Sequence, residues 1–127
     1  MLHIRKRTKS ALPSLPFEKI KDFILGQGYE LSLVFVGDKL SRKLNKKFRD
    51  KDRATNILSF PYSKTDGEIF IDPNIVKRES DREEQKFGSY LAYVFIHGLT
   101  HLKGFDHGSK LEVEENKAKK KFAELFL

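Results

Sequence analysis

Residues 87–107 have the sequence FGSYLAYVFIHGLTHLKGFDH. The spacing of their apolar residues predicts one long helix that runs toward Gly104 with an apolar face turned inward. Ser80 and Glu83 have the spacing of a capping box, which would start this helix. Gly104 can supply the left-handed residue that ends it. The residues expected on the buried face are Phe87, Leu91, Val94 and Phe95.

Short runs of β-branched and aromatic residues predict three strands before this helix, at 29–36, 56–60 and 68–72. Turn residues between the last two runs favour a hairpin. We therefore expect an α+β fold: a single compact domain over 1–127, with a small mixed sheet of about four strands and helices packed on it.

Further helical segments are predicted on both sides of the strands. The first is 16–25, which should end near Gly26, and the second is 39–49, which Asp38 could cap. Asp72 and Pro73 should begin a short helical turn. A capping box of Ser109 and Glu112 should begin the last helix.

The composition favours a soluble protein of the cytoplasm. The 127 residues include no cysteine, so any metal ligands must come from histidine or carboxylate. No apolar run approaches the ~20 residues that span a bilayer, and the basic start of the chain lacks the apolar segment of a secretory signal. We therefore expect no membrane partner.

Positive charge is unevenly distributed along the chain. The formal net charge is +7, and 39–53 holds eight basic residues against two acidic ones. Smaller basic clusters occur at 5–9 and 117–121. Such patches attract polyanions through contacts that depend strongly on salt, although a basic run can equally be an ordinary solvated surface.

Three of the four histidines lie within eleven residues, at positions 97, 101 and 107. His97 and His101 are four apart on the expected helix, so their imidazoles project from one face and one cation can bridge them. A turn after Gly104 can bring His107 toward the same point. Three neutral imidazoles without a fourth protein ligand suit one tetrahedral zinc ion per chain, with water in the open position, at the end of the long helix.

Other interpretations of this cluster stay open. The histidines can be ordinary side chains that bond to backbone or solvent, or the site can be structural, with Asp106 as a fourth ligand. We favour Asp106 as an outer carboxylate or a turn residue, because metal-bound imidazoles usually need an oriented acceptor. The spacing also matches the metzincin proteases, whose general base follows the first histidine, but that position here is Gly98. A peptidase of that kind therefore lacks its base.

The segment HGLTHLKGFDH closely resembles the signature HGxLHLxGYDH of the YbeY family, which are bacterial metal-dependent endoribonucleases and ribosomal RNA maturation factors. Residues 44–62, LNKKFRDKDRATNILSFPY, are similar to the family's second signature, LNxxYRxKDxPTNVLSFP, and 67–72, GEIFID, to the segment that follows it. The departures remove no expected ligand: they are Thr100 for leucine, Phe105 for tyrosine and Ala54 for proline.

The resemblance implies a zinc-binding α+β domain that processes RNA. It assigns His97, His101 and His107 as metal ligands and catalytic residues, and it singles out Arg49 as a further catalytic residue. The implied function is a zinc-dependent, single-strand-specific endoribonuclease that processes the 3′ end of small-subunit ribosomal RNA and serves ribosome quality control. The implied partners are ribosomal RNA and the ribosome or its small subunit, with no specificity for DNA.

The mechanistic hypothesis is hydrolysis of an RNA phosphodiester. The metal would activate water or polarise a phosphoryl oxygen, while Arg49 would neutralise charge that builds in the transition state. No side-chain general base is identifiable. The alternatives are a non-enzymatic RNA-binding assembly factor with a structural metal, and a zinc hydrolase of another substrate class. Further candidates for substrate contact, none of them catalytic, are Asn56, Ser59, Phe60 and Tyr62.

Overall fold

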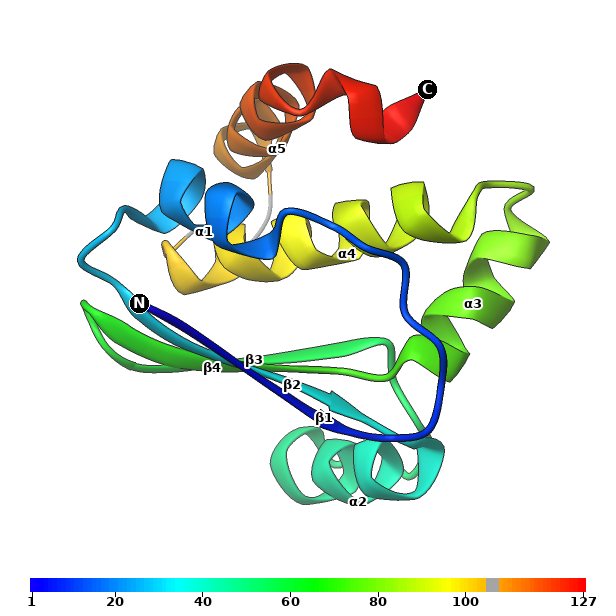
Figure 1. Cartoon of the computed structure of the whole chain (residues 1–127). Helices are drawn as coiled ribbons and strands as arrows, with labels where there is room; N and C mark the ends of the chain where they lie inside the picture. The colour runs from blue at the N-terminus through cyan, green and yellow to red at the C-terminus, as the bar shows by residue number, and fades with distance from the viewer. Residues whose placement is uncertain (105–107) are drawn as a thin grey trace.

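The structure, a computed structural model that describes residues 1–104 and 108–127, is built on a four-stranded mixed sheet (Figure 1). The strands are β1 (Leu2–Arg7), β2 (Glu30–Val36), β3 (Ile57–Ser63) and β4 (Asp66–Ile71), in the order β1-β2-β4-β3. β1 and β4 pair in parallel with β2, whereas β3 runs antiparallel to β4. The predicted α+β class and the predicted number of strands are confirmed.

Helices cover both faces of the sheet. They are α1 (Phe17–Leu25), α2 (Asp38–Arg49), α3 (Pro73–Arg82), α4 (Phe87–Leu102) and α5 (Ser109–Lys121), followed by a 3₁₀ turn, η1 (Ala123–Phe126). α1 and α4 lie on one face with α5 as an outer layer over them, and α2 lies on the opposite face (Figure 1). Within the described residues, no helix has both the length and the apolar character needed to cross a membrane.

α4 is the central helix, because its apolar face fills the space between the sheet and α5. Leu91 and Phe95 are fully buried there against sheet residues such as Leu33 and Ile69. The predicted inward face is therefore correct. Gly104, just beyond the helix, has a φ of +106°, which confirms the predicted left-handed terminator.

A glycine on α4 sets how closely this helix approaches β3. A Cβ atom on Gly98 would fall on the side chain of Ile57 and lie 3.1 Å from Ser59 Oγ. Only glycine permits this packing distance. The close contact holds the histidine-bearing end of α4 beside the start of β3.

Both predicted capping boxes are wrong. Ser80 lies inside α3 and its hydroxyl donates to the carbonyl of Lys77 at 2.8 Å, while α4 begins at Phe87 without a side-chain cap. Ser109 is the first residue of α5 and also makes no cap hydrogen bond. Serine can bond back to a preceding carbonyl in a helix, so a Ser-x-x-Glu spacing alone does not mark a helix start.

Asp72 is a helix cap, as predicted, but the helix that it starts is longer than expected. Its Oδ1 atom accepts hydrogen bonds from the backbone N–H groups of Asn74 and Ile75, at 3.1 and 3.4 Å. α3 then continues for ten residues rather than one short turn. Asp38, by contrast, makes no cap hydrogen bond and instead accepts one from Arg78 at 2.8 Å.

The sequence patterns do not predict β1. Every residue of β1 except Leu2 is exposed, so the strand lacks the alternation of buried and exposed residues that marks a half-buried strand. β1 is held instead by its parallel register with β2, from Leu2 opposite Leu31 to Arg7 opposite Val36. An edge strand fixed by backbone pairing leaves little trace in its side chains.

Candidate active site

His97 and His101 lie one turn apart on α4, and their Nε2 atoms face each other at a distance of 2.9 Å. Two imidazole nitrogens this close are aimed at one point, as their helical spacing predicts. Neutral imidazole nitrogens are good donors for a divalent ion such as zinc, so this pair fits part of a metal site. The third predicted ligand, His107, and Asp106 lie outside the described residues, and within the described ones no three metal-binding side chains cluster.

Glu115, on α5, orients the ring of His97. Its Oε1 atom accepts a hydrogen bond from His97 Nδ1 at 3.1 Å, and the residue is only 7% exposed. A proton held on Nδ1 leaves the lone pair of Nε2 free to point toward His101.

Sequence spacing alone does not identify Glu115, because the packing of α5 on α4 brings it to a histidine eighteen positions away. One signal was available: Glu115 lies on the buried face of α5 with Leu111 and Ala118. A carboxylate on an apolar face needs a partner, so such a position points to a buried interaction.

A cleft of about 710 Å³ brings Arg49 together with the two histidines. Arg49 is the last residue of α2 and lines this cleft with Lys51. Among the described residues Arg49 has no ion-pair partner, whereas Arg42 of the same helix is bound by Asp52 at 2.8 Å. A guanidinium fork without an acidic partner in the described part of the chain, next to two imidazole nitrogens, suits a phosphate group.

Asn56 and Ser59 also line this cleft, but their side chains are already engaged. Asn56 Nδ2 donates to Glu79 Oε1 at 2.9 Å, and Ser59 Oγ donates to the carbonyl of Gly98 at 3.3 Å. Both contacts join β3 and its preceding loop to the helices. These two residues therefore shape the wall of the cleft.

The two aromatic residues predicted to contact substrate lie elsewhere. Phe60 packs toward α2, with its ring 5.0 Å from that of Phe48, and Tyr62 is 62% exposed and donates to Glu68. The aromatic residues that line the cleft are Tyr90 and Tyr93. Burial raises the pKa of both phenols, with Glu115 adding to the effect at Tyr93, so both are neutral near pH 7.

Gly98 gives a physical reason why a metzincin-type base is absent. This position faces Ile57 and Ser59 of β3, where even a Cβ atom meets neighbouring atoms. A glutamate there would have no room without displacing the strand. The histidine spacing therefore occurs here without the carboxylate that the peptidase mechanism needs.

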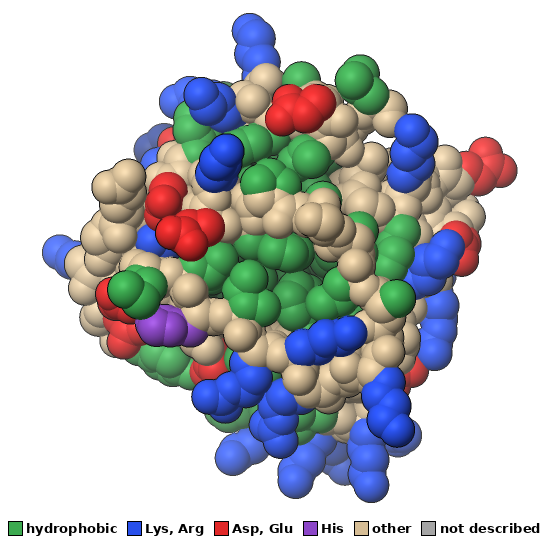
Figure 2. All heavy atoms as spheres, in the orientation of Figure 1, with side chains coloured by type: hydrophobic (Ala, Val, Ile, Leu, Met, Phe, Trp, Pro, Cys, Tyr) green, Lys and Arg blue, Asp and Glu red, His purple; other side chains and the backbone are tan. Residues whose placement is uncertain are grey.

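Basic side chains cover the surface next to the cleft. Figure 2 shows Lys and Arg gathered at the bottom of the view, over α2. The exposed members on α2 are Lys39, Arg42, Lys43, Lys46, Lys47 and Arg49. A polyanion bound to this face would reach the cleft through Arg49 and Lys51.

The fold and the site define a small α+β protein whose central helix α4 carries a histidine pair. Arg49 of α2 lines the same cleft as this pair, and the buried Glu115 of α5 bonds to His97. A family model described as Endoribonuclease YbeY matches residues 3–126. The chain therefore belongs to the YbeY family.

Individual relatives agree with this assignment. A protein of Colwellia psychrerythraea named Endoribonuclease YbeY is 38% identical over 96 residues, which cover 70% of this chain and 62% of the relative. One of Rhizobium etli with the same name is 32% identical over 122 residues, which cover 89% and 64%. The chain thus spans less than two thirds of the length of these relatives.

A solved structure supports the fold. The solution structure of TM1509 from Thermotoga maritima superposes with a TM-score of 0.70 at 25% sequence identity. The superposition covers 98% of this chain and 91% of that protein. The mixed sheet and its helices are therefore an arrangement that another protein also adopts.

Proposed function

We propose that this protein is a metal-dependent endoribonuclease that cuts single-stranded RNA during ribosomal RNA processing. The observation that carries the proposal is the convergence of His97 Nε2 and His101 Nε2 in the same cleft as Arg49, which has no ion-pair partner within residues 1–104 and 108–127. Membership of the YbeY family and the basic surface of α2 support it. The proposed substrate is the 3′ end of small-subunit RNA in the cytoplasm, with a further role in ribosome quality control.

The proposed metal is zinc, because a site of imidazole ligands suits this ion. His97 and His101 would hold it, His107 is the proposed third ligand, and Glu115 would keep the ring of His97 in place. When bound, the ion would supply a Lewis acid beside the scissile phosphodiester.

Basic residues of the chain would bind the phosphate and the RNA backbone. The guanidinium of Arg49 can donate hydrogen bonds to two phosphate oxygens at once and offset the charge that builds on them in the transition state. Lys51 adds a second positive charge in the same cleft. The exposed lysines of α2, which are Lys39, Lys43, Lys46 and Lys47, would hold the RNA backbone on its way to the cleft, whereas Arg42 is already paired with Asp52.

Cleavage of a defined single-stranded RNA by purified variants tests the proposal. Arg49→Ala and His101→Ala should each lose about 100-fold or more in cleavage rate, because each removes stabilisation of charge in the transition state. Arg42→Ala is the matched control, since it removes an exposed arginine of the same helix that does not line the cleft. Equal rates in all three variants would reveal a contaminating nuclease and contradict the proposal.

The same experiment separates the proposal from its alternatives. RNA binding by the zinc-loaded protein without scission would contradict an endoribonuclease and favour an assembly factor. A 5′-phosphate at the cut would indicate water as the nucleophile, and a 2′,3′-cyclic phosphate would indicate the neighbouring 2′-OH. Elemental analysis of the purified protein would test the choice of zinc.

A further inference from the structure

Four aromatic rings lie in a row along one side of α4, spaced three, four and four residues apart: Tyr90, Tyr93, His97 and His101. Successive ring centroids are 6.0, 6.2 and 4.5 Å apart. Spacings of three and four residues keep side chains on one face of a helix. The face that carries the histidine pair therefore continues toward the start of α4 as an aromatic surface.

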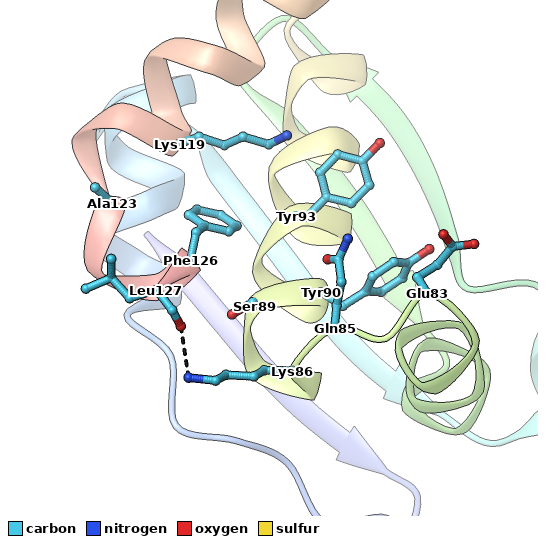
Figure 3. Close-up of a pocket in the computed structure, with 10 residues that line it drawn as sticks. All are labelled: Glu83, Gln85, Lys86, Ser89, Tyr90, Tyr93, Lys119, Ala123, Phe126 and Leu127. Carbon is cyan, nitrogen blue, oxygen red and sulfur yellow. Dashed lines mark hydrogen bonds between the residues drawn. The ribbon is translucent and has the colours of Figure 1, made fainter.

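A second cleft lies over this aromatic surface (Figure 3). Tyr90 and Tyr93 line it from α4, Lys119 lines it from α5 and Phe126 from η1. Tyr90 and Tyr93 also line the cleft of Arg49 and the histidines. The two clefts therefore adjoin at these two tyrosines.

Positive charge stands at both ends of the second cleft. Lys119 reaches across from α5, with its Nζ atom 4.7 Å from the centroid of the Tyr93 ring (Figure 3). Lys86 lies at the other end, where its Nζ atom donates to the carbonyl of Leu127 at 2.9 Å. Glu83 lies beside Tyr90, whereas Lys119 also lines a pocket with His97. Of the two lysines, Lys119 is therefore on the side of the histidine pair.

We propose that the second cleft is a subsite for a nucleotide that flanks the scissile phosphate of single-stranded RNA. Its base stacks on the Tyr90 ring, and its phosphate contacts Lys119, whose ammonium group lies over the ring of Tyr93. Aromatic side chains bind any unpaired base through its flat face, and a neighbouring cation binds the backbone. The inference rests on the proposed function and adds a physical source of single-strand preference, because a base within a duplex cannot turn its face to the protein.

The first test measures the affinity of the intact zinc-loaded protein for a 2′-O-methyl oligoribonucleotide. This probe has no free 2′-OH to act as a nucleophile. Tyr90→Ala should bind it about 10-fold more weakly, which corresponds to ~1.4 kcal/mol of stacking. Tyr62→Ala is the matched control, because it removes an exposed tyrosine of β3 that lines neither cleft. Tyr90 is preferred to Tyr93 because it is farther from the histidine pair.

A second variant keeps the test valid if Tyr90→Ala is poorly folded. The chain contains no tryptophan, so Tyr90→Trp introduces a single indole that retains a stacking face. Its fluorescence should be quenched by the oligonucleotide. An abasic site moved along the oligonucleotide should relieve the quenching at one position beside the cleavage site.

The outcomes distinguish the subsite from the function on which it rests. Equal affinities of the wild type and Tyr90→Ala, or Tyr90→Trp fluorescence that RNA does not change, would overturn the subsite and leave the endoribonuclease proposal standing. A wild-type protein that binds no single-stranded oligonucleotide would overturn both. Quenching that responds to every abasic position equally would also overturn the subsite, since it would show no defined place for a base.

Discussion

The carboxylate of Glu115 accepts a hydrogen bond from His97 Nδ1 across 3.1 Å, and this contact links α5 to the histidine pair on α4. A buried carboxylate that lost this donor would keep its desolvation cost without compensation. The two residues therefore stabilise both the docking of α5 and the orientation of one imidazole.

Replacing Glu115 by alanine should lower the affinity for zinc about 10- to 100-fold, because the ring of His97 loses the acceptor that fixes it. Competition with a chromophoric chelator measures this affinity without any cleavage assay. Glu115→Gln keeps an acceptor oxygen and should lose less. The control is Glu112→Ala, which removes an exposed acid one turn earlier on α5. Equal zinc affinities of Glu112→Ala and Glu115→Ala would refute the role of Glu115 in orienting His97.

Replacing Gly98 by alanine should lower the free energy of unfolding by ~1–3 kcal/mol, because the new methyl group overpacks the contact between α4 and β3. Urea denaturation measures the change. Gly88→Ala on the same helix is the control: its Cβ would lie 3.7 Å from the nearest atom, so it should stabilise the helix by ~0.5–1 kcal/mol. Similar changes in the two variants would show that close packing at position 98 is unimportant.

Replacing Asp72 by asparagine should change how stability depends on pH. Burial, and then the neighbouring Asp38, raises the pKa of Asp72 to about 6. Burial also acts to raise the pKa of Asp38, but hydrogen bonds with Asp72 and Arg78 outweigh it and lower that pKa. The folded protein therefore holds a proton on Asp72 more tightly than the unfolded protein does, because an unfolded aspartate has a pKa of ~3.9.

The stabilising contribution of this proton is complete below about pH 4 and is lost as the pH rises through about 6. Asparagine keeps the cap oxygen but cannot ionise. Asp72→Asn should therefore gain stability relative to the wild type between pH 4 and 6, by on the order of 2 kcal/mol. Denaturation across this range measures the difference, with the exposed Asp81→Asn as control. A difference that stays constant with pH would contradict the raised pKa of Asp72.

Replacing Lys43, Lys46 and Lys47 by alanine should flatten the dependence of RNA affinity on salt. Each lost phosphate contact reduces the slope of log K against log salt by ~0.7 for a single strand. The control is the triple alanine variant of Lys117, Lys120 and Lys121, exposed lysines of α5. An unchanged slope in the α2 variant would exclude that helix as the RNA track.

Periodic features of the fold could be predicted from the sequence, and features made by tertiary contacts could not. The histidine pair follows from helical spacing alone, and so does the buried face of α4. Glu115 reaches His97, and Tyr90 comes to line the second cleft, only because α5 and η1 pack over α4, which no local pattern encodes. The false capping box at Ser80 arose where a local motif was satisfied within a helix that continues.

The exposed edge strand β1 has a consequence for solubility. A strand at the margin of a sheet offers free backbone groups to any other strand that approaches it. Here that margin carries Arg5, Lys6 and Arg7, so a second copy would have to bring its own cations against them. Repulsion between these cations therefore prevents the β1 strands of two molecules from pairing edge to edge. Neutralising these three side chains would leave the chain prone to aggregate.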